Sequence, residues 1–76
     1  MPRQKQRRPE AEKFGAAVRR LRERRGLTQE ALAERSGITA TYVGFVERGD
    51  SVPTLTVILQ LATALKIRPG ELLDDL

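Results

Sequence analysis

The chain has 76 residues, enough for one small domain, and its 14 basic and 10 acidic residues give a formal net charge of +4. It contains no cysteine and no histidine, which excludes a disulfide and a thiolate- or imidazole-bound metal, and no spaced carboxylates suggest an active site, so we expect no enzyme, metal site or cofactor. No long apolar run follows the charged start, which argues against a signal peptide or a transmembrane helix and makes the cytoplasm the expected location.

The surplus positive charge lies at the start of the chain. Residues 1–9 contain four basic side chains and no acidic one, while the remainder balances ten basic against ten acidic residues. The four are Arg3, Lys5, Arg7 and Arg8. Because this stretch is rich in charge and proline and poor in apolar residues, we predict a disordered basic arm over residues 1–12 that contacts DNA.

After the arm, apolar residues at helical spacing predict five short helices and no strand over residues 13–76. Threonines that can cap a helix start and glycines that can end one mark most of the boundaries. In chain order they are Gly26, Thr28, Gly37, Thr39, Gly49 and Thr54. The fourth helix is the most apolar, with Leu55, Ile58, Leu59, Ala62 and Leu65 at helical spacing. Pro69 is well placed to begin the last helix. The expected fold class is a compact all-α domain.

The second and third predicted helices have the spacing of a helix-turn-helix motif. If Gln29 is position one, Ala33 is fifth and Gly37 is ninth, followed by three apolar residues at positions ten, fifteen and eighteen. A small residue lets the two helices approach, and a glycine allows a left-handed turn between them. The three apolar residues, Ile38, Val43 and Val46, can bury one face of the later helix and leave the other face for a DNA groove.

From Phe14 to Leu73 the chain resembles the Cro/repressor-type, or XRE-like, helix-turn-helix family. The stretches "VRRLRERRGLTQEALAERSGI", "VERG" and "PTLTVILQLATALKIRPGELL" carry this resemblance, and "TYVGFVERG" is similar to the restriction–modification controller group. The resemblance implies a regulator of transcription that binds a palindromic operator as a homodimer, with residues 39–47 in the major groove and no small-molecule effector. An antitoxin-like or adaptor module remains the alternative, with a protein as its main partner and DNA binding used for autoregulation.

The same resemblance assigns roles on the DNA side. Base contacts fall to Thr39, Ala40, Thr41, Gly44 and Phe45, none of which can pair bidentately with a base, so methyl contacts and DNA shape have to contribute. Phe45 could instead be buried against the fourth helix. The resemblance gives Gln29 a contact to a DNA phosphate. By their placement, further candidates for backbone contact are Thr28, Arg35, Tyr42, Arg48, Ser51 and Arg25. Arg48 and Ser51 are expected in the loop before the fourth helix, where Arg48 could instead meet a base edge, and Tyr42 could instead fill the gap between the motif helices.

Two further roles concern the structure of the domain. The resemblance implies a partly buried ion pair between Arg22 and Glu47 that fixes the angle of the recognition helix. We expect the dimer interface at the end of the chain, where Leu73 and Leu76 are the favoured intermolecular contacts. The whole predicted set is Leu65, Ile67, Leu72, Leu73 and Leu76. Alternatively, all five cap the core of the monomer.

Overall fold

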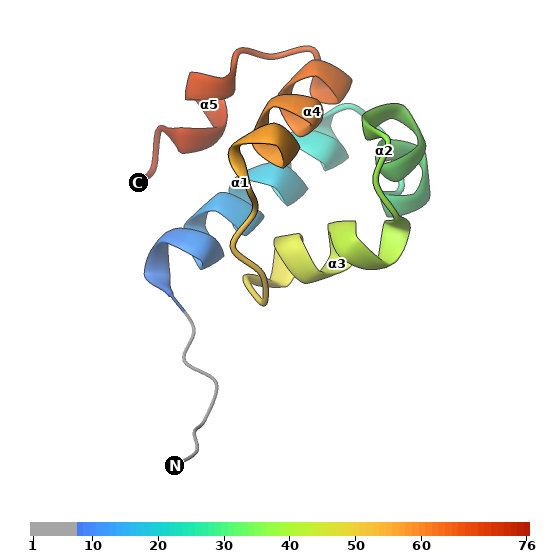
Figure 1. Cartoon of the computed structure of the whole chain (residues 1–76). Coiled ribbons are helices and arrows are strands. Elements are labelled where there is room, and N and C mark those ends of the chain that lie inside the picture. Colours follow the sequence, from blue (N-terminus) through green and yellow to red (C-terminus); the bar gives the residue numbers. More distant parts are fainter. Residues whose placement is uncertain (1–7) are drawn as a thin grey trace.

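The computed structural model describes residues 8–76 of the chain, and they form five α-helices (Figure 1). In order they are α1 (Pro9–Arg24), α2 (Gln29–Ser36), α3 (Ala40–Arg48), α4 (Leu55–Leu65) and α5 (Pro69–Leu73). The predicted all-α, five-helix fold is confirmed.

Threonine caps and left-handed glycines set the boundaries of the central helices. The hydroxyl oxygens of Thr28, Thr39 and Thr54 each accept a hydrogen bond from the backbone N–H three residues later, at 3.0, 3.0 and 3.2 Å. Each of these bonds satisfies a backbone donor that the first turn of a helix leaves without an intrahelical partner. Gly37 and Gly49, which end α2 and α3, both have φ = 79°. Residues that have a side chain rarely adopt this backbone angle.

The first helix begins earlier than the sequence predicted. Residues 9–12, expected in the basic arm, are helical, and the helix starts with Pro9 in its first turn. Glu10 and Glu12 lie in the first turn, where acidic side chains interact favourably with the positive end of the helix dipole. Ala11, between them, is buried. Of the four basic residues of the predicted arm, the structure describes the exposed Arg8, while Arg3, Lys5 and Arg7 lie outside the described residues.

The core forms where α1 packs against α3 and α2 packs against both α3 and α4. Its fully buried larger side chains are Val18, Leu32, Val43, Val46, Leu61, Leu65 and Leu72. Gly15 marks the closest approach, because a Cβ there would overlap the backbone carbonyl oxygen of Val46 and lie 2.7 Å from that of Glu47. Where the residue after α3 meets the first turn of α1, a Cβ on Gly49 would lie 2.9 Å from the Cα of Glu12. The start of α1 is therefore fixed against the end of α3.

The fourth helix follows its predicted apolar spacing in part. Of the five residues at helical spacing, Ala62 and Leu65 are buried and Ile58 packs against the core, while Leu55 and Leu59 are 70% and 45% exposed. Because apolar residues occur nearly all round α4, its spacing alone does not determine which face is inward. No helix among residues 8–76 combines the length and apolar character needed to cross a membrane.

Candidate nucleic-acid interface

The two motif helices meet as the spacing predicted. Ala33 is buried in the interior, and the chain turns at Gly37 before Thr39 caps α3. Ser36, the last residue of α2, is buried and donates its hydroxyl to the carbonyl of Leu32 at 2.7 Å. In Figure 1, α3 lies along the lower edge of the molecule, and no other helix covers its outer side in that view.

The inner face of α3 is buried and its outer face carries short polar and apolar groups. Val43 and Val46 are buried, while Thr39 and Thr41 are exposed and Ala40 is half-buried. Phe45 is 42% exposed, which excludes its burial against α4. An exposed aromatic ring on this helix therefore faces solvent in the DNA-free chain.

Gly44 does not lie on the open surface as predicted. It is buried, because Arg48 folds back over it: a Cβ built on Gly44 would lie 3.2 Å from Nη1 of Arg48 and 3.8 Å from Oε1 of Gln29. In this conformation the missing side chain leaves room for the guanidinium group of Arg48. The base contact of Gly44 stays a prediction.

Arg48 is the last residue of α3, not a loop residue as predicted. Its guanidinium carbon lies 5.3 Å from the centroid of the Phe45 ring, within the range of a cation–π contact. Its Nε donates to Oδ2 of Asp50 at 3.0 Å. The sequence did not predict Asp50 as the partner of Arg48, because no local pattern marks an acidic residue after a glycine as one side of an ion pair.

Arg22 of α1 and Glu47 of α3 form the predicted ion pair. Nε and Nη2 of Arg22 donate to the two carboxylate oxygens of Glu47 at 2.6 and 3.0 Å, and Nη1 donates to the carbonyl of Leu27 at 2.8 Å. The Arg22 and Glu47 side chains are only 11% and 3% exposed. Their hydrogen bond raises the pKa of Arg22 further above its ordinary value, although burial acts against this. The pair joins α1 to the end of α3.

Gln29, at the start of α2, belongs to the same network. Its Nε2 donates to Oε1 of Glu47 at 3.0 Å, so the side chain is half-buried rather than extended into solvent. Tyr42 is also half-buried and packs against the core, and its hydroxyl accepts a hydrogen bond from Ser51 at 3.3 Å. Thr28 and Arg35 are exposed, and the Thr28 hydroxyl already serves as the α2 cap.

Comparison with known proteins fits this geometry. The HTH_3 family model, described as helix-turn-helix, matches residues 18–72. The chain belongs to the HTH_3 family of XRE/Cro type. It is therefore a DNA-binding regulator of transcription of the helix-turn-helix class, and the family is not one of enzymes.

Individual HTH_3 relatives show the same likeness over most of the chain. The HTH-type transcriptional regulator YazB of Bacillus subtilis is 38% identical over 63 residues, 83% of this chain and 91% of YazB. The control protein C.SmaI of Serratia marcescens is 45% identical over 56 residues, 74% of this chain and 67% of C.SmaI. The solved structure of the restriction–modification controller protein C.AhdI of Aeromonas hydrophila is 51% identical and superposes with a TM-score of 0.84, covering 86% of this chain and 98% of that one.

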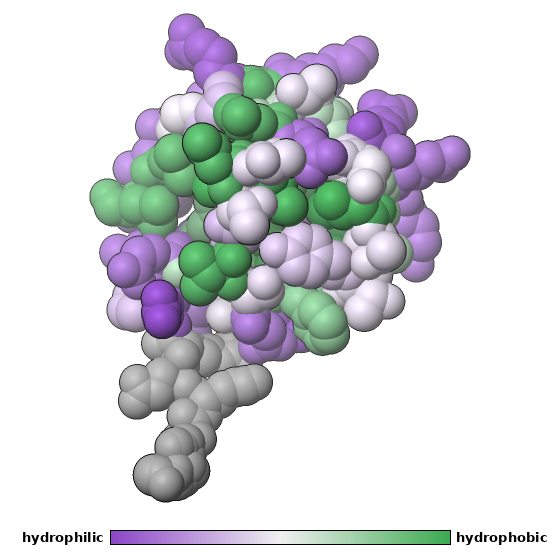
Figure 2. Space-filling model, in the orientation of Figure 1, coloured by the Kyte–Doolittle hydropathy of each residue, from purple (hydrophilic) through white to green (hydrophobic). Residues whose placement is uncertain are grey.

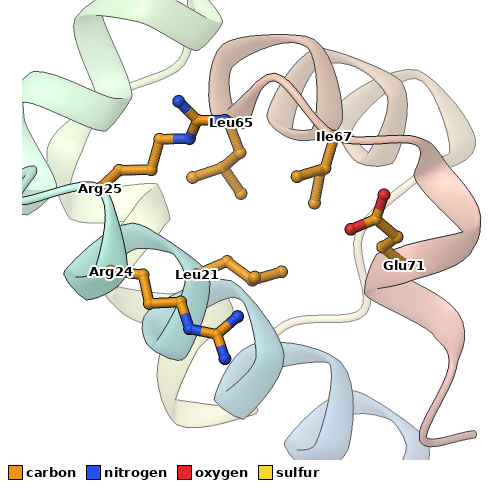
Figure 3. A pocket seen from close by; sticks show the side chains of 6 residues that line it. All are labelled: Leu21, Arg24, Arg25, Leu65, Ile67 and Glu71. Atoms are coloured by element: carbon orange, nitrogen blue, oxygen red, sulfur yellow. The ribbon is translucent and has the colours of Figure 1, made fainter.

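Arg25, predicted to contact DNA, lies elsewhere on the domain. Its guanidinium donates to the carbonyl of Lys66 at 3.4 Å, at the turn between α4 and α5, on the side of the molecule away from α3 (Figure 1). Figure 3 shows it on the wall of a surface cavity into which the side chains of Leu21, Leu65 and Ile67 point. This hydrogen bond directs the Arg25 side chain towards α5, and its DNA contact stays a prediction.

The predicted dimer residues divide into two groups. Leu65 and Leu72 are fully buried in the monomer, so they cannot form an interface, and Ile67 packs against the core. Leu73 and Leu76 remain exposed and line an apolar hollow together with Val52, which the sequence analysis did not single out. Figure 2 shows apolar surface gathered over α5 and the adjoining part of α4.

Proposed function

We propose that the chain acts as a homodimer on a palindromic operator, with α3 of each protomer in the major groove. The observation that carries this proposal is the two-sided character of α3. Its inner face is buried and joined to α1 by the Arg22–Glu47 pair, while its outer face carries the exposed Thr41 and Phe45. A helix held at a fixed angle with an open face suits direct reading of base edges.

On this proposal, four residues of the outer face contact bases and a surrounding set contacts phosphates. The base contacts are Thr39, Ala40, Thr41 and Phe45. The phosphate contacts are Thr28, Gln29, Arg35, Tyr42 and Ser51. The Tyr42 and Ser51 hydroxyl oxygens lie 3.3 Å apart, so the two side chains present neighbouring hydroxyl groups of the kind that contact phosphate oxygens.

The basic arm would add affinity without sequence preference. Arg8, the one basic residue of the arm that the structure describes, directly precedes α1. The start of α1 lies against the end of α3 at Gly49. An arm leaving from this point can follow the DNA backbone beside the recognition helix. Its four basic residues would neutralise phosphates and release counterions.

The second protomer would cover the apolar hollow near the end of the chain. We assign to this interface Val52, Leu73 and Leu76, which are exposed and line the hollow. We add Leu55, an exposed residue on the first turn of α4. One recognition helix reads only a few base pairs, so a two-fold dimer doubles the sequence read and sets the half-sites about one DNA turn apart. Burial of apolar surface supplies the free energy of association.

The relatives suggest a biological setting. C.SmaI is a control protein and C.AhdI is a restriction–modification controller by name, and both share close to half of the aligned residues with this chain. We propose a similar role for this chain in a bacterial cytoplasm, as the regulator of one or a few operons.

Selection of bound fragments from a random pool of duplex DNA, with the full chain as bait, tests the proposal. The expected result is one palindromic site whose half-sites are centred about 10 base pairs apart, or a multiple of this. Sedimentation with and without the recovered duplex should show two protomers per site. Recovery of unrelated sequences would contradict operator binding, and one protomer per site would contradict the dimer.

A further inference from the structure

The outer face of α3 has one pair of side chains that act together. Phe45 and Arg48 lie three residues apart, hence on the same side of the helix, and both are partly exposed. The guanidinium carbon of Arg48 lies 5.3 Å from the centroid of the Phe45 ring. Together they form a continuous surface with an apolar part and a cationic, hydrogen-bonding part.

Asp50, the Phe45 ring and Gly44 are among the neighbours that contact Arg48. Asp50 accepts from Nε at 3.0 Å, and the Phe45 ring lies beside the guanidinium. Nη1 lies against Gly44, where a Cβ would come within 3.2 Å. A guanidinium fixed before binding loses less conformational freedom when it pairs with a ligand. Gly44, which weakens the helix by about 1 kcal/mol relative to alanine, is thereby explained as a seat for Arg48.

We propose that Phe45 and Arg48 jointly read two adjacent base pairs: Phe45 contacts the methyl group of a thymine, and Arg48 pairs with O6 and N7 of a neighbouring guanine. Each part suits its target, since apolar groups recognise the thymine methyl and arginine is the usual bidentate partner of guanine. The two groups lie 5.3 Å apart, between one and two base-pair rises of about 3.4 Å each, so they can reach neighbouring base pairs. This inference rests on the proposed function and specifies what its site reads.

Modified bases in the operator recovered from the random pool test this directly, with the full chain as it exists. In one half-site, each thymine is replaced in turn by deoxyuridine, which lacks only the methyl group. Each guanine is replaced by 7-deazaguanine, which lacks N7, or by inosine as the matched control, since inosine changes only the minor-groove amino group. The dissociation constant of each duplex is then measured.

The expected result is one sensitive thymine next to one sensitive guanine. Loss of one buried methyl group should weaken binding about fourfold, and loss of N7 should weaken it by about fivefold or more. Inosine at that guanine should be tolerated. If no thymine and guanine respond, or if those that respond are not adjacent, the joint reading is overturned while operator binding stands. If the pool yields no operator, both proposals fall.

Variants assign the two effects to the two side chains. Phe45→Ala should abolish the sensitivity to deoxyuridine, and Arg48→Met, which removes the hydrogen-bond donors, should abolish the sensitivity to 7-deazaguanine. Arg19→Ala is the control, because Arg19 is an exposed arginine of α1 whose loss should leave both effects intact. Sensitivities that persist in Phe45→Ala and Arg48→Met would overturn the assignment.

Gly44→Ala separates this role from a structural one. The added methyl group would lie 3.2 Å from Nη1 of Arg48, so the guanidinium must shift by a few tenths of an ångström. This shift should reduce the sensitivity to 7-deazaguanine, while the melting temperature stays the same or rises. A variant that keeps full sensitivity would show that the seat at Gly44 is not used for reading.

Discussion

Replacement of Glu47 by alanine should destabilise the domain strongly, because Glu47 is a buried charge with a buried partner. Its two oxygens accept from Nε and Nη2 of Arg22 at 2.6 and 3.0 Å, and Oε1 also accepts from Gln29 at 3.0 Å. In Glu47→Ala, the Arg22 guanidinium would keep only its bond to the carbonyl of Leu27. Removing one member of a buried pair costs about 3–5 kcal/mol.

That loss is large for a chain of this size. At roughly 0.05–0.15 kcal/mol per residue, a domain of this length has a free energy of unfolding of about 4–11 kcal/mol. Each kcal/mol lowers the melting temperature of a small domain by about 4–8 °C, so a fall of at least 12 °C or so is expected. Thermal unfolding followed by circular dichroism at one fixed protein concentration measures it, since association shifts the transition.

Two companion variants make the experiment decisive. Glu23→Ala removes a partner from the exposed Arg19–Glu23 pair, at 3.2 Å, and should cost only about 0.3–0.5 kcal/mol. Replacing the whole buried pair, as Arg22→Met with Glu47→Leu, should recover much of the loss, because no unpaired charge remains. Equal melting temperatures for Glu47→Ala and Glu23→Ala would refute the reasoning.

Three further predictions concern the arm, the interface and the packing of α1. Deletion of residues 1–8 should weaken binding to all DNA sequences alike and lower the slope of log affinity against log salt by up to about 3.6, or 0.9 for each of four basic residues; an unchanged slope would place the arm off the DNA. Leu73→Asp should give monomers in sedimentation that bind a palindromic site poorly, whereas unchanged dimers would exclude Leu73 from the interface. Gly15→Ala should cost about 1–3 kcal/mol in chemical unfolding because its Cβ overlaps the Val46 carbonyl. Gly70→Ala, which has open space at its Cβ, is the control, and equal losses would contradict the close approach.

The helix boundaries could be predicted because their causes are local. A threonine that caps the first turn acts within three residues, and Gly37 and Gly49 act at their own φ angles. The Arg22–Glu47 pair, by contrast, spans 25 residues and was expected only from the family resemblance. The helix boundaries were therefore predicted from local interactions, and the Arg22–Glu47 contact was predicted from the family resemblance.

What could not be predicted depends on neighbours distant in the sequence or on ambiguous patterns. The need for a glycine at position 15 could not be predicted, because it arises from the close approach of the α3 backbone. The orientation of α4 was wrong at Leu55 and Leu59 because apolar residues surround that helix. Gly44 was predicted to be exposed because it occupies an outward position of the helix, but the long side chain of Arg48, four residues later, covers it. Arg48 was predicted in a loop, but it is the last residue of α3.

The central claim is that the outer face of α3 recognises a particular DNA sequence. The most direct test is the ratio of affinities for the selected operator and for random duplex of equal length, measured at physiological salt for the wild type and for Thr41→Ala. We predict a ratio of at least about 10³ for the wild type. Thr41→Ala should lower that ratio while leaving the affinity for random DNA unchanged, since base contacts specify and phosphate contacts position. A wild-type ratio near one, or an equal loss on both duplexes in the variant, would contradict the claim.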